Sequence, residues 1–79
     1  MAEKTVKAQI PGTFYRRPDP DSDYYVEEGA QVSAGDTVGL IEVMKSFQEV
    51  KAEEDGTISK FLVGDEQAVD AGQDILEME

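Results

Sequence analysis

One lysine near the middle of the chain stands where a tight turn is expected. The stretch Glu42-Val43-Met44-Lys45-Ser46-Phe47 joins two segments, 37–43 and 47–52, that are rich in β-branched and apolar residues. This composition predicts two strands joined by a hairpin turn. Two-residue hairpin turns favour Asn-Gly, Asp-Gly or Gly-X, because their backbones need positive φ. Met44-Lys45 breaks that rule, and a local rule broken at a turn points to a functional site more often than average.

The chemistry open to Lys45 is that of a single reactive amine on a long, flexible stem. Taken alone, the pair Met44-Lys45 is most simply read as an ordinary solvated segment on a loop slightly longer than two residues. The alternative is that the amine is exposed in order to be acylated. The rest of the chain decides between these two interpretations.

The composition removes several classes of site. The 79 residues predict one small domain without cysteine or histidine. Disulfides, Cys- or His-ligated metal sites and a hydrolytic triad are therefore excluded, and we expect no metal. A net charge of −11 disfavours binding to nucleic acid or to an anionic membrane. No signal-peptide pattern and no membrane-length apolar run is found, so a cytoplasmic protein is the default expectation.

Short extended segments separated by turn signals recur along the whole chain. Val6, Ala8 and Ile10 alternate with polar residues, which predicts a half-buried strand over 5–10. The other expected strands are 13–15, 24–26, 31–32, 37–43, 47–52, 57–63, 68–69 and 74–78. The expected core residues are Phe14, Ile41, Val50, Ile58, Leu62, Val69 and Ile75. With no helical period, and with Asp55-Gly56 as a further hairpin turn signal, the pattern predicts an all-β sandwich or barrel.

An internal repeat supports this fold. Val32 to Val38 resembles the segment 69–75, which lies 37 residues later, and Gly12-Thr13-Phe14 resembles Gly56-Thr57-Ile58 at an offset of 44. The difference of 7 predicts extra residues in the first half, where the segment 16–23 contains two prolines and forms a stiff polar loop. A pseudo-twofold arrangement would bring the chain ends together and leave Lys45 at the opposite end.

From about residue 6 to residue 79, the chain resembles the C-terminal biotinyl domain of the biotin carboxyl carrier protein of bacterial acetyl-CoA carboxylases. The matching stretches are Pro11 to Arg16, Pro18, Pro20-Asp21, Glu27, Gly29, Val32, Gly35 to Thr37, Ile41 to Lys45 and Asp55 to Thr57. The extra loop coincides with the "thumb" of that subclass, at about 17–23.

The resemblance implies a single biotinyl domain over 1–79. Its fold is all-β, a flattened antiparallel barrel or sandwich of two four-stranded sheets with a pseudo-twofold repeat. Lys45 would carry biotin in amide linkage. Met44 and Glu42 would help present Lys45 to the biotin protein ligase. The thumb residues implied to touch the biotin ring are Asp21, Ser22 and Asp23.

The function implied is that of a carrier and not of an enzyme by itself. A biotin carboxylase would load carboxylate onto the biotin, and a carboxyltransferase would pass it to an acyl-CoA such as acetyl-CoA, in fatty acid biosynthesis. In this interpretation the cofactor supplies the chemistry and the protein supplies orientation and delivery.

Two departures from the family pattern leave other interpretations open. Ser46 replaces the usual Met after the lysine, and the N-terminal region and linker of longer carriers are missing from the sequence. The chain is therefore expected to be either a short stand-alone carrier or an excised domain. The closest alternative is a lipoyl-type carrier, although lipoyl domains typically have Asp where Met44 stands. The other alternative is an unmodified β-barrel interaction module.

Overall fold

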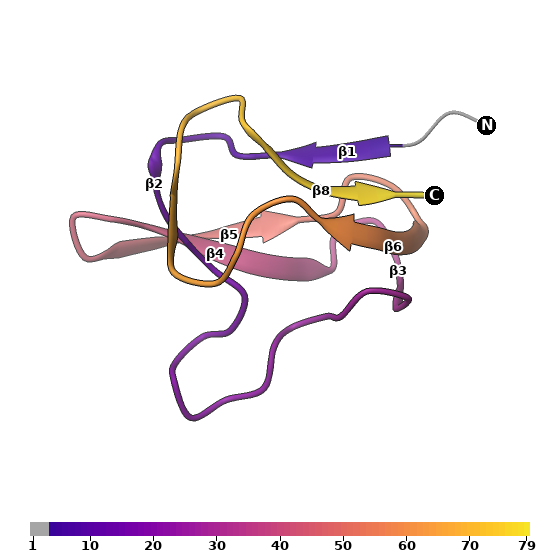
Figure 1. Ribbon diagram of the computed structural model, residues 1–79, viewed down its shortest axis with the longest axis horizontal. Helices are drawn as coiled ribbons and strands as arrows, with labels where there is room; N and C mark the ends of the chain where they lie inside the picture. The colour runs from indigo at the N-terminus through magenta and orange to yellow at the C-terminus, as the bar shows by residue number, and fades with distance from the viewer. Residues whose placement is uncertain (1–3) are drawn as a thin grey trace.

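The computed structural model describes residues 4–79, and within them the chain forms eight strands and no helix. The strands are β1 (Lys4–Lys7), β2 (Gly12–Tyr15), β3 (Gln31–Val32), β4 (Thr37–Val43), β5 (Ser46–Lys51), β6 (Gly56–Phe61), β7 (Gln67–Val69) and β8 (Asp74–Met78). They build two four-stranded antiparallel sheets, with the strand orders β1-β8-β6-β3 and β5-β4-β2-β7 (Figure 1). The expected all-β fold of two four-stranded sheets is confirmed.

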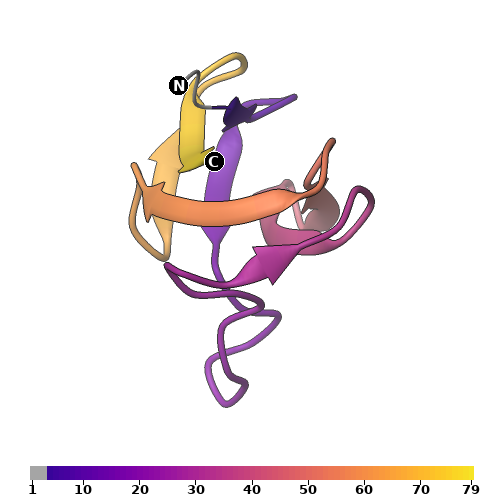
Figure 2. The same cartoon turned by 90° about the vertical axis from the view of Figure 1, so that its right-hand side faces the viewer.

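The two sheets repeat one topology. In the orders β1-β8-β6-β3 and β5-β4-β2-β7, the strands at the same position are β1 and β5, β8 and β4, β6 and β2, and β3 and β7. Each pair is separated by four strands along the chain, so the second half repeats the first. Gly35 and Gly72 adopt positive φ, 93° and 83°, in the equivalent turns that precede β4 and β8. The main difference lies between β2 and β3, where the loop 16–30 extends away from both sheets (Figure 2). The second half has only the short turn 62–66 at the equivalent place.

Apolar side chains from both sheets meet in one core. Side chains that point to the inner face of each sheet build this core, and in β4 the residues from Val38 to Ile41 are all buried. Phe14, Ile41, Ile58 and Ile75 are at most 1% exposed, as expected. The buried residues that cluster in this core are Val6, Ala8, Phe14, Val32, Val38, Ile41, Val50, Ala52, Ile58, Val63, Val69, Ile75, Leu76 and Met78.

The expectation that Leu62 is a core residue was wrong. Its side chain is 38% exposed, because β6 ends at Phe61 and the chain turns there. The backbone N–H of Leu62 still donates a 2.8 Å hydrogen bond to the carbonyl oxygen of Ile75. Val63, the next residue, is buried instead.

The segment 24–26 is not a strand, contrary to expectation. The backbone N–H of Tyr25 donates to the carbonyl oxygen of Arg16 at 2.8 Å, and Nη2 of Arg16 donates to the carbonyl oxygen of Val26 at 3.3 Å. These contacts bring the end of the loop back beside its beginning without forming a ladder.

Asp55-Gly56 does not form a hairpin turn either, because β5 and β6 belong to different sheets. The Asp55 carboxylate accepts a 2.8 Å hydrogen bond from the backbone N–H of Ala34. Gly56 allows a close approach of two backbones, since a Cβ there would lie 2.6 Å from the carbonyl oxygen of Glu79. The connection is therefore a crossover between the layers.

The ends of the described chain lie together, far from the central hairpin. β1 pairs with β8, and Lys4 lies opposite Met78. The β4–β5 hairpin projects from the other end of the molecule (Figure 1). The expected placement of Lys45 away from the chain ends is confirmed.

Candidate functional site

Lys45 occupies the second position of a two-residue hairpin turn. Val43 and Ser46 form the last pair of the β4–β5 ladder, so only Met44 and Lys45 lie between the strands. Their φ angles are 50° and 68°, which are left-handed values. Such values are unfavourable for residues that have a Cβ, and the turn lacks the glycine or asparagine that normally relieves this strain. The residue with the reactive amine is therefore one of the positions with a strained backbone.

The hairpin tip is open to solvent. Met44 is 93% exposed, and Lys45 is exposed beside it. Within residues 4–79, no hydrogen bond or ion pair involves the Lys45 side chain. The rigid ladder below the turn fixes the root of the stem, while the amine stays accessible to a partner.

The 16–30 loop is anchored at its base by Arg16. The Arg16 guanidinium lies 3.9 Å from the ring centroid of Phe61 and 4.1 Å from that of Tyr24. Two cation–π contacts hold a side chain more firmly than one contact does. Asp65 completes the anchor: its carboxylate accepts from the backbone N–H of Arg16 at 2.8 Å and lies 3.4 Å from Nε of Arg17. The loop is therefore tied to the sheets at its root.

A cleft of about 280 Å³ opens between this loop and the hairpin. Phe47, which is two residues beyond Lys45, contributes one wall, and Pro18 and Pro20 of the loop contribute another. The complete lining is Tyr15, Arg17, Pro18, Asp19, Pro20, Phe47, Asp65 and Glu66. Apolar surface is combined with several charged groups, so the cleft suits a small group that has an apolar body and a polar end.

Tyr15 connects the cleft to the stem of the hairpin. Its hydroxyl donates a 2.9 Å hydrogen bond to Oε1 of Glu42, and its ring centroid lies 6.4 Å from that of Phe47. The hydrogen bond to Glu42, followed by desolvation and nearby carboxylates, raises the pKa of Tyr15 above 10.0. Burial, with the charges of Glu49 and Asp19, likewise raises the pKa of Tyr25.

The residues expected at the site fall into two groups. Glu42, Met44 and Lys45 lie together on the hairpin, at the end of β4 and in the turn. Asp21, Ser22 and Asp23 lie in the middle of the loop and do not line the cleft. Asp19 orders this part of the loop, because its carboxylate accepts from the backbone N–H of Asp21 and from the hydroxyl of Ser22, both at 3.0 Å.

Tyr15, Arg16, Phe47 and Asp65 are among the residues of this region that were not assigned a role from the sequence. Tyr15 and Arg16 belong to a stretch that carries the family resemblance, and Phe47 is adjacent to the departure at Ser46. Asp65 offers no sequence signal, since it lies in a turn far along the chain from the loop it holds.

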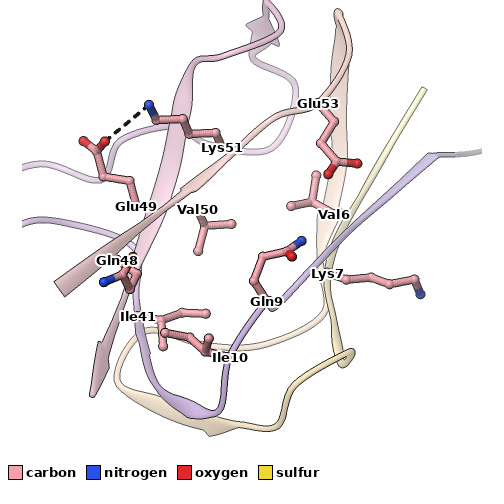
Figure 3. A pocket seen from close by; sticks show the side chains of 10 residues that line it. All are labelled: Val6, Lys7, Gln9, Ile10, Ile41, Gln48, Glu49, Val50, Lys51 and Glu53. Atoms are coloured by element: carbon pink, nitrogen blue, oxygen red, sulfur yellow. Dashed lines mark ion pairs between the residues drawn. The ribbon is translucent and has the colours of Figure 1, made fainter. Parts of the chain in front are cut away.

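A second hollow lies between the β1–β2 connection and β5, away from the hairpin turn (Figure 3). Ile10, Ile41 and Val50 form its apolar floor, and these residues belong to the core or pack against it. The rim mixes both charges and includes the ion pair of Glu49 with Lys51. It is the gap between two sheet edges, and none of the expected site residues lines it.

Two kinds of feature were not found in residues 4–79. No group of three or more candidate metal-binding side chains lies together in this part of the chain. No helix there is long and apolar enough to cross a membrane.

Comparison with known proteins gives a consistent result. Residues 4–78 match the family model described as "Biotin-requiring enzyme". The chain is 39% identical over 75 residues to the biotin carboxyl carrier protein of acetyl-CoA carboxylase from Pyropia yezoensis, covering 95% of this chain and 48% of that protein. It is 40% identical over 68 residues to the protein of the same name from Pseudomonas aeruginosa, covering 86% and 44%. The chain thus spans about half the length of these curated relatives.

Solved structures show the same fold. The urea carboxylase of Kluyveromyces lactis matches with a TM-score of 0.82 and 25% identity, over 100% of this chain and 6% of that one. A single-chain, multi-domain long-chain acyl-CoA carboxylase matches with a TM-score of 0.80 and 26% identity, over 96% of this chain and 7% of that one. In both cases the matching region is a small part of a large carboxylase.

Proposed function

The chain belongs to the family of biotin-requiring enzymes, and on this basis we propose that it is a biotin carrier domain whose Lys45 bears the biotin. The observation that supports this most directly is the geometry of the turn, where an unpaired, exposed amine stands on a strained two-residue tip. A structural hairpin would gain stability from Asn-Gly at this place. The presence of the less stable Met44-Lys45 pair is explained if a partner enzyme must reach the lysine amine.

The residues around the tip fit an amide-linked group of this kind. Lys45 can be acylated without breaking any hydrogen bond or ion pair found in residues 4–79. Glu42 and Met44 precede it on the hairpin and would meet the biotin protein ligase. The nearby cleft, with Phe47 and Pro18 in its walls, offers the tethered group a surface to rest on.

We further propose that the thumb at about 17–23 meets the biotin ring. The loop is fixed at its root by Arg16 and Asp65, so it can hold its position beside the hairpin. Asp21, Ser22 and Asp23 remain the proposed ring contacts, and the cleft lining adds Arg17 and the two prolines as candidates.

Bound biotin would supply an ureido nitrogen that accepts and releases carboxylate. The protein's own part is to hold the root of the arm rigid, to keep the tip exposed and to present the same end of the molecule to each partner. The proposed partners are a biotin carboxylase and a carboxyltransferase, with acetyl-CoA as the acyl-CoA acceptor, in the cytoplasm. The single domain would carry no catalytic group of its own.

The test is covalent loading. Purified protein is incubated with biotin, ATP and a biotin protein ligase, and intact mass and peptide mapping are recorded. We expect one biotin increment, on Lys45, and its complete loss in Lys45→Arg, because arginine keeps the charge but cannot be acylated in this way. Lys51→Arg is the matched control, an exposed lysine on the same hairpin, and it should load normally.

The same experiment separates the alternatives. A biotin increment on Lys45→Arg, or none on folded wild-type protein with several ligases, would contradict the proposal. Loading by a lipoate ligase in its place would identify a lipoyl-type carrier. No loading by either enzyme would favour an unmodified interaction module.

A further inference from the structure

We propose that Tyr15 is a positioning residue that holds Glu42 and Phe47 as a preformed contact surface for the ligase that modifies Lys45. This inference rests on the proposed function and goes beyond it, because Tyr15 lies on a different strand and has no part in the attachment itself. The structure assigns this role through two simultaneous contacts, one made by the hydroxyl of Tyr15 and the other by its ring.

The first contact fixes a carboxylate. Glu42 lies opposite Phe47 on β5 and opposite Thr13 on β2, so it stands in the middle of three strands. An unrestrained Glu side chain at the end of a strand samples several rotamers. The 2.9 Å hydrogen bond from the Tyr15 hydroxyl selects the arrangement in which the carboxylate turns toward β2. A charged acceptor makes this hydrogen bond stronger than a neutral one.

The second contact supports an exposed aromatic ring. Phe47 is 54% exposed, although large apolar side chains are usually covered. The ring of Tyr15 packs against it with an interplanar angle of 52°. This tilted contact is a favourable geometry for two aromatic rings and limits the motion of Phe47. The exposed face of Phe47 remains available to a partner.

Glu42 and Phe47 together give the stem of the hairpin a surface with a carboxylate beside an exposed aromatic ring. They form one cross-strand pair beneath the turn, so a protein that brings its active site to Lys45 must pass close to them. A fixed carboxylate beside an exposed ring suits a partner surface with a cation next to an apolar recess. Because Tyr15 orders both groups before the partner arrives, less conformational freedom is lost on binding.

The test uses substitutions that remove the hydroxyl contact and leave the ring contact in place. Tyr15→Phe keeps the ring against Phe47 and removes only the hydroxyl. Glu42→Gln removes the charge and keeps an acceptor for Tyr15. Tyr24→Phe is the matched control, because it removes a phenol hydroxyl that makes no hydrogen bond within residues 4–79. Each apo-protein is titrated as substrate with biotin, ATP and a purified biotin protein ligase.

We expect Tyr15→Phe to raise the KM for the apo-protein about two- to tenfold, the range expected from the loss of one ordering hydrogen bond. The kcat should stay unchanged, because Tyr15 does not touch the reacting amine. Combining Tyr15→Phe with Glu42→Ala should raise KM no further than Glu42→Ala alone, because Tyr15 acts through Glu42. Tyr24→Phe should match the wild type.

A direct readout accompanies the kinetics. Ultraviolet titration of the tyrosines should show one ionisation moving to lower pH in Glu42→Gln and disappearing in Tyr15→Phe. An unchanged KM in Tyr15→Phe, or additive effects in the double variant, would overturn the inference. If the wild type still loads biotin normally, the proposed function is unaffected by that result. A wild-type chain that accepts no biotin would overturn both.

Discussion

The backbone N–H of Arg16 donates a 2.8 Å hydrogen bond to the carboxylate of Asp65, which lies 49 residues further along the chain. The second oxygen of the same carboxylate lies 3.4 Å from Nε of Arg17. One half-buried side chain in the second half of the chain therefore secures the base of a loop in the first half. This loop borders the cleft beside Lys45, so Asp65 acts on the candidate site without belonging to the hairpin.

Replacing Asp65 by alanine should loosen the loop and lower stability. The backbone N–H of Arg16 would lose its carboxylate acceptor, and we expect a loss of about 1–3 kcal/mol in the free energy of unfolding. Urea denaturation measures this loss. Hydrogen exchange of the Tyr25 amide, which donates to the carbonyl oxygen of Arg16, reports on the loop itself and should become faster.

The control for this loss is Asp70→Ala. Asp70 is exposed, and its carboxylate makes no hydrogen bond or ion pair within residues 4–79. This variant should stay within about 0.5 kcal/mol of the wild type, as surface substitutions usually do. Equal stability of the two variants would show that Asp65 does not anchor the loop.

The hairpin turn should become more stable when its function is removed. Lys45 has φ of 68°, a value that glycine adopts without steric cost. Lys45→Gly should therefore raise the free energy of unfolding by about 0.5–1 kcal/mol, the relief of left-handed strain less the extra freedom of the unfolded chain. It should also abolish biotin loading, since the amine is gone. Thermal unfolding and intact mass measure the two effects on one sample.

Glu66 provides the comparison for this prediction. In residues 4–79, three non-glycine residues have a left-handed backbone: Met44 and Lys45 of the turn, and Glu66 with φ of 62°. Glu66→Gly should stabilise by a similar amount. A Lys45→Gly variant that is less stable than the wild type, beside a stabilised Glu66→Gly, would mean that the turn is not strained.

Much of the fold could be predicted because the local pattern and the repeat agree. Alternation over 5–10 and the matched segments before β4 and β8 were enough to predict an all-β sandwich or barrel and the isolation of Lys45, whereas the two four-stranded sheets were implied by the family resemblance. The sequence led to a wrong prediction where one dipeptide is compatible with two backbone geometries. Asp55-Gly56 is typical of a hairpin turn, yet here Gly56 is needed because the backbone of Glu79 lies against it. Only the packing of two sheets distinguishes these cases.

The candidate site was predictable only in its linear part. Glu42, Met44 and Lys45 lie within four consecutive residues, so one sequence motif includes all three. Tyr15 reaches Glu42 across 27 residues, because β2 happens to lie beside β4. Composition and periodicity give no indication of such a pair, and neither predicts the walls of the cleft.

Gly39 should tolerate no side chain. A Cβ at this position would lie 2.4 Å from Cε1 of Phe14 and 2.9 Å from the carbonyl oxygen of Tyr15. Phe14 is fully buried in the core. Gly39→Ala should therefore destabilise by about 1–3 kcal/mol, as overpacked cores do. This corresponds to a fall in Tm of roughly 4–8 °C for each kcal/mol in a domain of this size.

The matched control is Gly64→Ala, where the nearest atom to a new Cβ is 3.7 Å away, in an ordinary contact with the Gln67 side chain. Gly64 also has no left-handed backbone. Its Tm should stay near that of the wild type. Equal Tm values for Gly39→Ala and Gly64→Ala would contradict the close packing of Gly39 on Phe14.

Alkaline pH should reveal the hydrogen bond between Tyr15 and Glu42 in the stability of the fold. The folded protein raises the pKa of Tyr15 above the ordinary value of 10.0, because Glu42 accepts a bond from the neutral phenol. The folded state therefore holds this proton more tightly than the unfolded state does. The resulting stability is complete below about pH 10 and is lost as pH rises through the pKa of folded Tyr15.

Urea denaturation from about pH 8 to about pH 11.5 should show wild type losing stability more steeply than Tyr15→Phe. Lysine ionisation affects both proteins alike and cancels in the comparison. Glu42→Ala should behave like Tyr15→Phe in the steep region, because it removes the acceptor of the hydrogen bond that is the main cause of the raised pKa. Parallel curves for the three proteins would show that the bond contributes nothing to folding.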